Sequence, residues 1–190
     1  KLNKSGINDV SIVCDAEQQE ICNVVAHLKG QNPAAAAVVL GAHLDHLGRE
    51  KKKVFAGADD NASGVAVVLE VARQLNKQAG MRNLDVVFFD GEESGRLGSV
   101  SYIKNQTPST IHSMVNLDTV GRLADGKPLL VLDGDSASEW VHVARGVGFT
   151  TNVAVELAPN GGGASDQRSF NDAGIAAIQL FSGPNTDYHQ

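Results

Sequence analysis

The chain has 190 residues, of which 42% are hydrophobic and 20% are charged, and its formal net charge at pH 7 is −6. This length and composition predict one globular domain with a sizeable hydrophobic core. The negative charge argues against a nucleic-acid partner, because phosphate binding needs a basic surface, and the dense group of Lys and Arg at 49–53 is expected to be a solvated loop.

No apolar run in the sequence is long enough to cross a bilayer, so a membrane partner is not expected either. The first residues, Lys1 to Lys4, lack the pattern of a secretory signal peptide. Because the chain begins without Met, we expect a processed protein or a piece of a longer one.

The N-terminal part of the chain fits two different structures. Its apolar residues recur at helical spacing after Asp15, a possible helix N-cap, so periodicity alone favours a helix. The β-branched residues favour instead a hairpin of residues 10–14 and 22–28, which we prefer on a resemblance described below. The hairpin would bring Cys14 and Cys22 onto neighbouring strands, where two buried free thiols are the favoured state.

Several later apolar runs end abruptly on polar residues. The run at 86–89 is bulky and shows no alternation, which is typical of a strand covered on both faces, and the runs at 34–40 and 111–118 predict further strands. In α/β proteins, ligand sites lie beyond the carboxyl ends of the strands. The polar residues at these ends are His43, Asp45, His46, Glu92, Glu93 and Asp118.

These residue types suit a metal site. His43 can present one imidazole nitrogen to a metal ion, and Asp45 can accept a hydrogen bond from the other nitrogen and fix the tautomer. His46 could be a ligand too, but adjacent residues on an extended chain point apart, so it is expected only to line the site. Glu92 and Glu93 would repel each other when both are ionised, and a bound cation is the simplest compensation.

A helix is predicted from about Ala62 to near Gly80, because apolar residues recur there at helical spacing. Asp59, Asp60 and Asn61 precede it, and each of them could be the N-cap. Two aspartates and an asparagine exceed what capping requires.

The remaining elements continue the alternation of helices and strands. They are a short helix at 96–106, a strand at 129–132, a helix opened by a capping box of Ser136 and Glu139, and strands at 153–157 and 175–181. This order predicts an α/β fold, a three-layer sandwich in which helices flank a mixed, mostly parallel central sheet.

Taken together, the motifs resemble the co-catalytic dizinc aminopeptidases, which include bacterial leucyl-type aminopeptidases and, more distantly, glutamate carboxypeptidase-like zinc exopeptidases. The resemblance covers nearly the whole chain, and the motifs occur in family order. It identifies Asn23 to Ala26 with a strand that precedes the His motif in the family, which is why the hairpin is preferred. The motifs are Gly41–Asp45, Gly57–Gly64, Phe88–Glu93, Asn116–Asp118, Ser165–Asp166 and Asp187–His189.

The resemblance implies a zinc peptidase fold and two zinc ions per chain. Asp60 would bridge the ions, with His43 and Asp118 completing one set of ligands and Glu93 and His189 the other. Residues 1–190 would form a single catalytic domain that lacks the C-terminal helix of the family, since the chain stops at Gln190.

The resemblance also implies a reaction, the removal of N-terminal residues from peptides by a metal-bridging hydroxide. Glu92 would be the general base, Asp45 would orient His43, and Tyr188 would donate a hydrogen bond to the developing oxyanion. A glutaminyl cyclase-like enzyme with one zinc ion and a non-catalytic binding module are the alternatives. Because many relatives are exported, a secreted or periplasmic location is expected.

Overall fold

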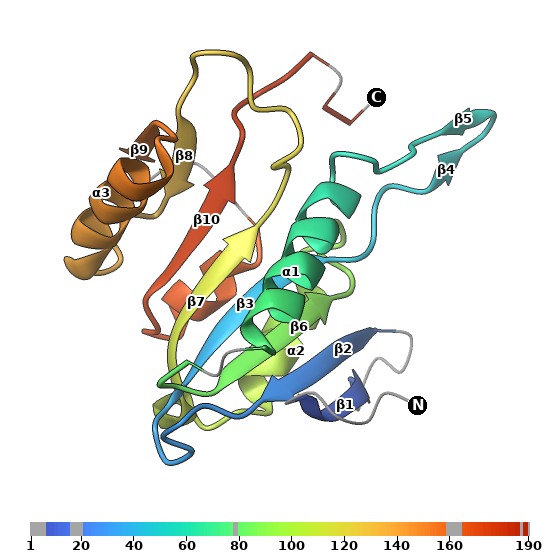
Figure 1. Cartoon of the computed structure of the whole chain (residues 1–190). Helices are drawn as coiled ribbons and strands as arrows, with labels where there is room; N and C mark the ends of the chain where they lie inside the picture. Colours follow the sequence, from blue (N-terminus) through green and yellow to red (C-terminus); the bar gives the residue numbers. More distant parts are fainter. Residues whose placement is uncertain (1–6, 16–20, 78–79, 159–164, 187, 190) are drawn as a thin grey trace.

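A single large sheet organises the protein (Figure 1). The structure is a computed structural model that describes residues 7–15, 21–77, 80–158, 165–186 and 188–189. The sheet has eight strands in the order β1-β2-β6-β3-β7-β10-β8-β9, and β4 pairs with β5 in a separate ribbon. The strands are β1 (Ile7–Cys14), β2 (Cys22–Leu28), β3 (Ala37–His43), β4 (Arg49–Glu50), β5 (Lys53–Val54), β6 (Leu84–Phe89), β7 (Ile111–Leu117), β8 (Leu129–Leu132), β9 (Val155–Ala158) and β10 (Ala177–Phe181).

The centre of the sheet is parallel and its margins are mixed. β6, β3, β7 and β10 run parallel to one another, while β2 is antiparallel to β6 and β8 is antiparallel to β10. The predicted α/β fold with a mixed, mostly parallel sheet is therefore confirmed. The predicted hairpin is confirmed as well, because β1 and β2 pair antiparallel and Cys14 lies opposite Cys22.

Helices cover both faces of the sheet. They are α1 (Ala62–Leu75), α2 (Leu97–Lys104), the 3₁₀ helix η1 (Pro108–Thr110), α3 (Glu139–Thr151) and α4 (Gln167–Asp172). Figure 1 shows α1 in front of the central strands and α2 behind them, while α3 lies beside β9. None of the helices in the described part of the chain is both long and apolar enough to cross a membrane.

The core is divided by the sheet into two clusters. Val86 and Phe88 of β6 pack with Val68 of α1 on one face. Val87 and Phe89 point the other way and pack with a cluster that includes Phe170 of α4. Successive residues of β6 are thus buried on opposite faces, as its lack of alternation predicted.

Several elements differ from the sequence predictions in their bounds or their type. β3 begins at Ala37 rather than at 34, because Pro33 and Ala35 form a turn whose carbonyl groups accept hydrogen bonds from the side chain of Asn83. α1 ends at Leu75 rather than near Gly80, since no bulky apolar side chain follows that would extend its buried face. The basic segment forms the β4-β5 ribbon rather than a loop.

The predicted capping box of Ser136 and Glu139 is wrong. The hydroxyl of Ser136 donates to the carbonyl oxygen of Ala177 and accepts from the indole nitrogen of Trp140, at 2.9 and 3.0 Å. It is therefore engaged in joining α3 to β10. Ser138 is the N-cap residue of α3, and its side chain makes no capping hydrogen bond.

The two cysteines form a disulfide, so the prediction of two buried free thiols is wrong. Cys14 is exposed and Cys22 is half-buried. They are directly opposed on antiparallel strands, with 4.0 Å between their Cα atoms, and the side chains of opposed residues lie on the same face of the sheet. A cross-strand bond between the sulfur atoms follows from the register of the hairpin.

We expect replacement of both cysteines, by Cys14→Ser and Cys22→Ser, to lower the free energy of unfolding by about 2–3 kcal/mol. The disulfide restricts the conformations of a short loop in the unfolded chain, and without it the unfolded chain has a higher entropy. Urea unfolding curves check this. A reductant should bring the wild-type curve onto that of the double variant and leave the variant unchanged. Equal stability of the oxidised wild type and the double variant would contradict the prediction.

Candidate metal centre

The polar residues predicted at the strand ends converge on one edge of the sheet. His43 is the last residue of β3, Glu92 and Glu93 follow β6, and Asp118 follows β7. Because these strands are parallel neighbours, their carboxyl ends lie side by side. The main chain strengthens this edge, since the amide of Leu44 donates to the carbonyl oxygen of Phe89 over 2.7 Å.

Asn61, not Asp60, caps the helix that follows. The side-chain oxygen of Asn61 accepts from the amide of Gly64 at 3.0 Å, and its amide nitrogen donates to the carbonyl oxygen of Leu117 at 2.9 Å. A side chain at Gly64 would collide with that same Leu117 oxygen, so the start of α1 can lie against the end of β7 only with glycine here. Asp60 is thereby placed beside Asp118 and is free of a capping role.

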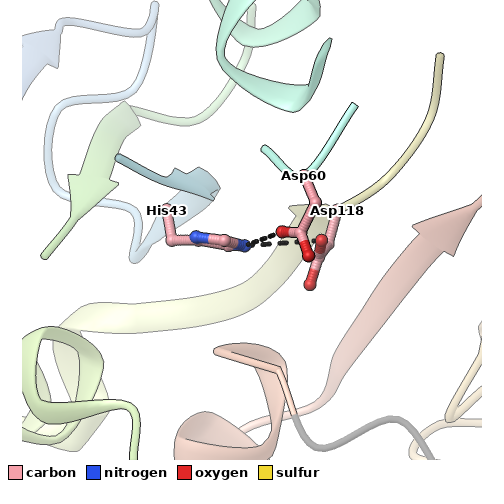
Figure 2. A group of neighbouring side chains, drawn as sticks. All are labelled: His43, Asp60 and Asp118. Carbon is pink, nitrogen blue, oxygen red and sulfur yellow. Dashed lines mark ion pairs between the residues drawn. The ribbon is translucent and has the colours of Figure 1, made fainter. Parts of the chain in front are cut away.

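His43, Asp60 and Asp118 form a first group of possible metal ligands (Figure 2). The Nε2 atom of His43 lies 3.1 Å from Oδ1 of Asp60 and 3.4 Å from Oδ1 of Asp118. Nδ1 of His43 donates to the main-chain carbonyl of Asp45 at 3.0 Å, so Nε2 is the nitrogen that faces the carboxylates. All three side chains are buried.

The charges of this group fit a cation. Burial alone would lower the pKa of His43, but the adjacent Asp118 and Asp60 carboxylates raise it to about 12. Burial would raise the pKa of Asp118, yet His43 holds it below its usual value.

Nε2 of His43 lies at ion-pair distance from both carboxylates, but it makes no hydrogen bond of good geometry among the described residues. Ligand atoms around a tetrahedral zinc ion lie about 3.3 Å apart, so imidazole and carboxylates at these distances suit zinc.

A second group lies on the other side of Asp60. His46, Asp60 and Glu93 bring ligand atoms together, and His189 approaches the same two carboxylates. Nε2 of His189 lies 3.1 Å from Oδ2 of Asp60 and 3.7 Å from Oε2 of Glu93. Asp60 thus directs Oδ1 toward His43 and Oδ2 toward His189, which is the arrangement that a bridging carboxylate requires.

His46 contributes more than the pocket lining expected of it. Its Nδ1 lies 2.7 Å from Oε1 of Glu93 and 3.8 Å from Oδ2 of Asp60. The expectation for His46 assumed that it lies on an extended strand. However, β3 ends at His43, and residues 44–48 do not continue the strand. A second histidine three residues after the first was the available signal in the sequence.

Asp45 accepts the expected hydrogen bond from His43 through its main chain. Its carboxylate is 3.7 Å from Nδ1 of His43, and the hydrogen bond goes to its main-chain carbonyl instead. The two carboxylate oxygens accept from the amides of Glu92 and Glu93 at 3.0 and 3.1 Å. Asp45 therefore joins the His43 segment to the loop that presents both glutamates.

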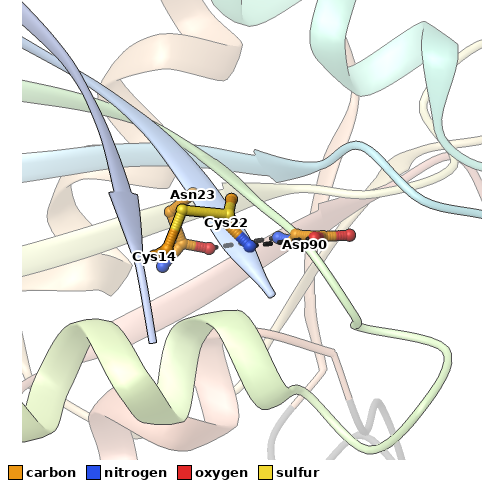
Figure 3. Close-up of a disulfide and its surroundings, with 4 residues drawn as sticks. All are labelled: Cys14, Cys22, Asn23 and Asp90. Carbon is orange, nitrogen blue, oxygen red and sulfur yellow. Dashed lines mark hydrogen bonds between the residues drawn. A yellow bond between two sulfur atoms is a disulfide. The ribbon is translucent and has the colours of Figure 1, made fainter. Parts of the chain in front are cut away.

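The same loop is attached to the hairpin (Figure 3). The amide of Cys22 donates to the carboxylate of Asp90 at 3.0 Å, and the amide of Asp90 donates to Asn23 at 3.1 Å. Asn23 in turn donates to the carbonyl of Gly98 at 2.9 Å. The disulfide-bonded end of the hairpin therefore holds the base of the Glu92 loop.

Two carboxyl groups beside the centre have perturbed acidity. Burial raises the pKa of Glu92 to about 8, and the charges of Asp166, Asp118 and Glu93 act in the same direction. Burial also raises the pKa of Asp166 to about 7. Asp166 is the N-cap residue of α4, but its side chain makes no capping hydrogen bond. Such shifts are concentrated at functional sites.

A pocket of about 180 Å³ opens beside the second group and is lined by His46, His189, Tyr188 and Arg122, among others. The ring of Tyr188 stacks on that of His189, with 3.9 Å between the ring centres. Burial and the nearby carboxylates raise the pKa of Tyr188 to about 12, so the phenol keeps its proton at neutral pH. Asp187 of the C-terminal motif lies outside the described residues.

Comparison with known proteins shows to which family the chain is similar. The sequence matches peptidase family M28 over residues 23–190. Leupeptin-inactivating enzyme 1 of Streptomyces exfoliatus is 32% identical over 169 residues, which make up 85% of this chain and 36% of that enzyme. The chain therefore spans about a third of the length of this curated relative.

Solved structures agree with the sequence match. BSAP, a zinc aminopeptidase from Bacillus subtilis, superposes with a TM-score of 0.76 and 27% identity, over 89% of this chain and 43% of that chain. A glutaminyl cyclase from Porphyromonas gingivalis superposes with a TM-score of 0.72 at 22% identity, over 94% of this chain and 69% of that chain, which shows a common fold alone. On the extent of the sequence match, the chain belongs to peptidase family M28.

Proposed function

We propose that this chain is the catalytic part of a zinc-dependent aminopeptidase that binds two zinc ions. The observation that supports this most strongly is the position of Asp60 between two groups of ligand atoms. His43 and Asp118 would complete one set of ligands, and Glu93 and His189 the other. The names of the related zinc aminopeptidase and peptidase family support a peptide substrate with a free N-terminus.

The side chains around the ligands suit peptide hydrolysis. Two bound zinc ions would polarise the scissile carbonyl and make the attacking water more acidic. Glu92 would take a proton from that water and give it to the leaving amine. The protonated phenol of Tyr188, which lines the pocket, would donate a hydrogen bond to the oxyanion.

Asp45 would act as a positioning residue in this reaction. By accepting from both glutamate amides, its carboxylate holds the proposed base and the proposed ligand Glu93 in a fixed relation to His43. Preorganisation of this kind is needed because small displacements of catalytic groups are costly to the rate.

We further propose that residues 1–190 act as one catalytic domain in a secreted or periplasmic protein. The Cys14–Cys22 disulfide supports this location, because such bonds persist in oxidising compartments and are rare in the cytosol.

We expect the purified chain, loaded with zinc and desalted, to retain two ions, and Asp60→Asn to retain at most one, because the amide removes the bridging charge. Metal analysis by mass spectrometry measures both. Asp125→Asn, at an exposed position, is the matched control and should retain two. One ion in the wild type would favour the cyclase-like alternative, and none would favour a binding module.

We expect Glu92→Gln to lower kcat on leucyl amide substrates by about 10²–10⁴-fold while both ions stay bound, because the amide cannot accept a proton. Steady-state kinetics and metal analysis of the same sample test this. Glu156→Gln, an exposed carboxyl on β9, should leave both quantities unchanged. Full turnover by Glu92→Gln would refute the assignment of the base.

The same substitution should stabilise the metal-free protein. A folded-state pKa of about 8 exceeds the ordinary carboxyl value, so the stability that the proton confers is present at low pH and is lost as pH rises from about 4.5 to 8. Glu92→Gln should therefore raise Tm at pH 8 by about 2–4 °C or more, and little at pH 5. Calorimetry on chelator-treated protein measures this, and the opposite pH trend would be inconsistent with the raised pKa.

A further inference from the structure

Two histidines lie close to the same pair of carboxylates. The rings of His46 and His189 are 5.8 Å apart, and both approach Oδ2 of Asp60 and the carboxylate of Glu93. A tetrahedral zinc ion bridged by Asp60 has few positions for protein ligands. The roles of the two histidines must therefore be distinguished.

The distances separate a ligand from a hydrogen-bond donor. Ligand atoms of one tetrahedral zinc ion are about 3.3 Å apart. The 3.1 and 3.7 Å distances of His189 Nε2 lie on either side of this value. Nδ1 of His46 lies 2.7 Å from Oε1 of Glu93, which is too short for two ligands of one ion and typical of a charge-assisted hydrogen bond.

The two oxygens of Glu93 are divided between these partners. Oε1 faces His46 and Oε2 faces His189. On the basis of the proposed function, we propose that His46 is a positioning residue: its Nδ1–H donates to Oε1 of Glu93, which fixes the carboxylate so that Oε2 and His189 hold the second ion. Metal-bound carboxylates commonly have hydrogen-bonded supports of this kind.

The surroundings of His46 suit a fixed ring. The side chain is 12% exposed and contacts the ring of Phe55 edge-on, with 6.4 Å between the ring centres. Gly57, at a φ of 64°, lies directly against it, since an added Cβ there would be 3.1 Å from the Cβ of His46. The ammonium of Lys53 lies 4.5 Å above the Phe55 ring. Lys53 of β5 and the adjacent Phe55 thus form a chain of contacts that ends on the ring of His46.

The test compares three substitutions. His46→Asn places an amide N–H near the former Nδ1 and can still donate, although it is a poor zinc ligand. His46→Ala removes the donor, and His189→Ala removes the proposed ligand. Zinc binding is measured by competition with a chelator, and the absorption spectrum of cobalt(II)-loaded protein reports the ligands directly. Circular dichroism of each metal-free variant checks that it is folded.

We expect two ions in the wild type and one in His189→Ala. His46→Ala should still bind two, with the second held about 10–100-fold more weakly. His46→Asn should restore an affinity close to that of the wild type and leave the cobalt spectrum unchanged. Such a rescue is not expected of a residue that only fills space or binds the metal.

Other results would overturn the inference in recognisable ways. If His46→Asn binds one ion, or loses the same cobalt absorption as His189→Ala, His46 is a ligand. If His46→Ala binds the second ion as tightly as the wild type, the hydrogen bond has no positioning role. If the wild type itself binds fewer than two ions, the proposed function fails first, and the inference about His46 fails with it.

Discussion

The shared carboxylate of Asp60 is the interaction on which the candidate metal centre depends. Its two oxygens face different histidines, at 3.1 Å from His43 and 3.1 Å from His189. Asp118 and Glu93 add negative charge in the same small volume. Like charges at such distances are costly unless cations are present, so the arrangement is stable only with positive charge between the two halves. The surrounding structure has to hold these groups together against their repulsion.

The sheet supplies most of that restraint. β6 is packed on both faces, with Phe88 in the cluster below α1 and Phe89 in the cluster below α4, so its carboxyl end cannot move without disturbing two cores. Asn61 ties the start of α1 to the end of β7, which fixes the spacing of Asp60 and Asp118. Hydrophobic packing far from the candidate metal centre therefore sets the distances between its side chains.

The central strands and the sheet edge where polar residues converge were predictable, because apolar runs and their ends are visible in the local sequence. The hairpin was not predictable in this way, since periodicity alone favoured a helix there and the family resemblance decided the choice. What the sequence did not reveal depends on which partner a polar group finds in space. The hydroxyl of Ser136 bonds to Ala177 rather than to its own helix, and the carboxylate of Asp45 bonds to the glutamate amides rather than to His43. His46 was underestimated because its orientation depends on where β3 ends.

The His43 group and the His189 group of the candidate metal centre are held in place by different kinds of contact. His43 belongs to a central strand with its side chain wholly buried, so packing holds it in place. His189 belongs to a C-terminal segment that is attached by polar contacts, including Asn185 to Asp59 at 3.2 Å and Ser182 to Thr119 at 2.7 Å. Hydrogen bonds near the surface open more readily than a packed core. If two ions bind as proposed, the one on the His189 side should therefore exchange faster than the other, because the segment that would hold it can open without disturbing the sheet.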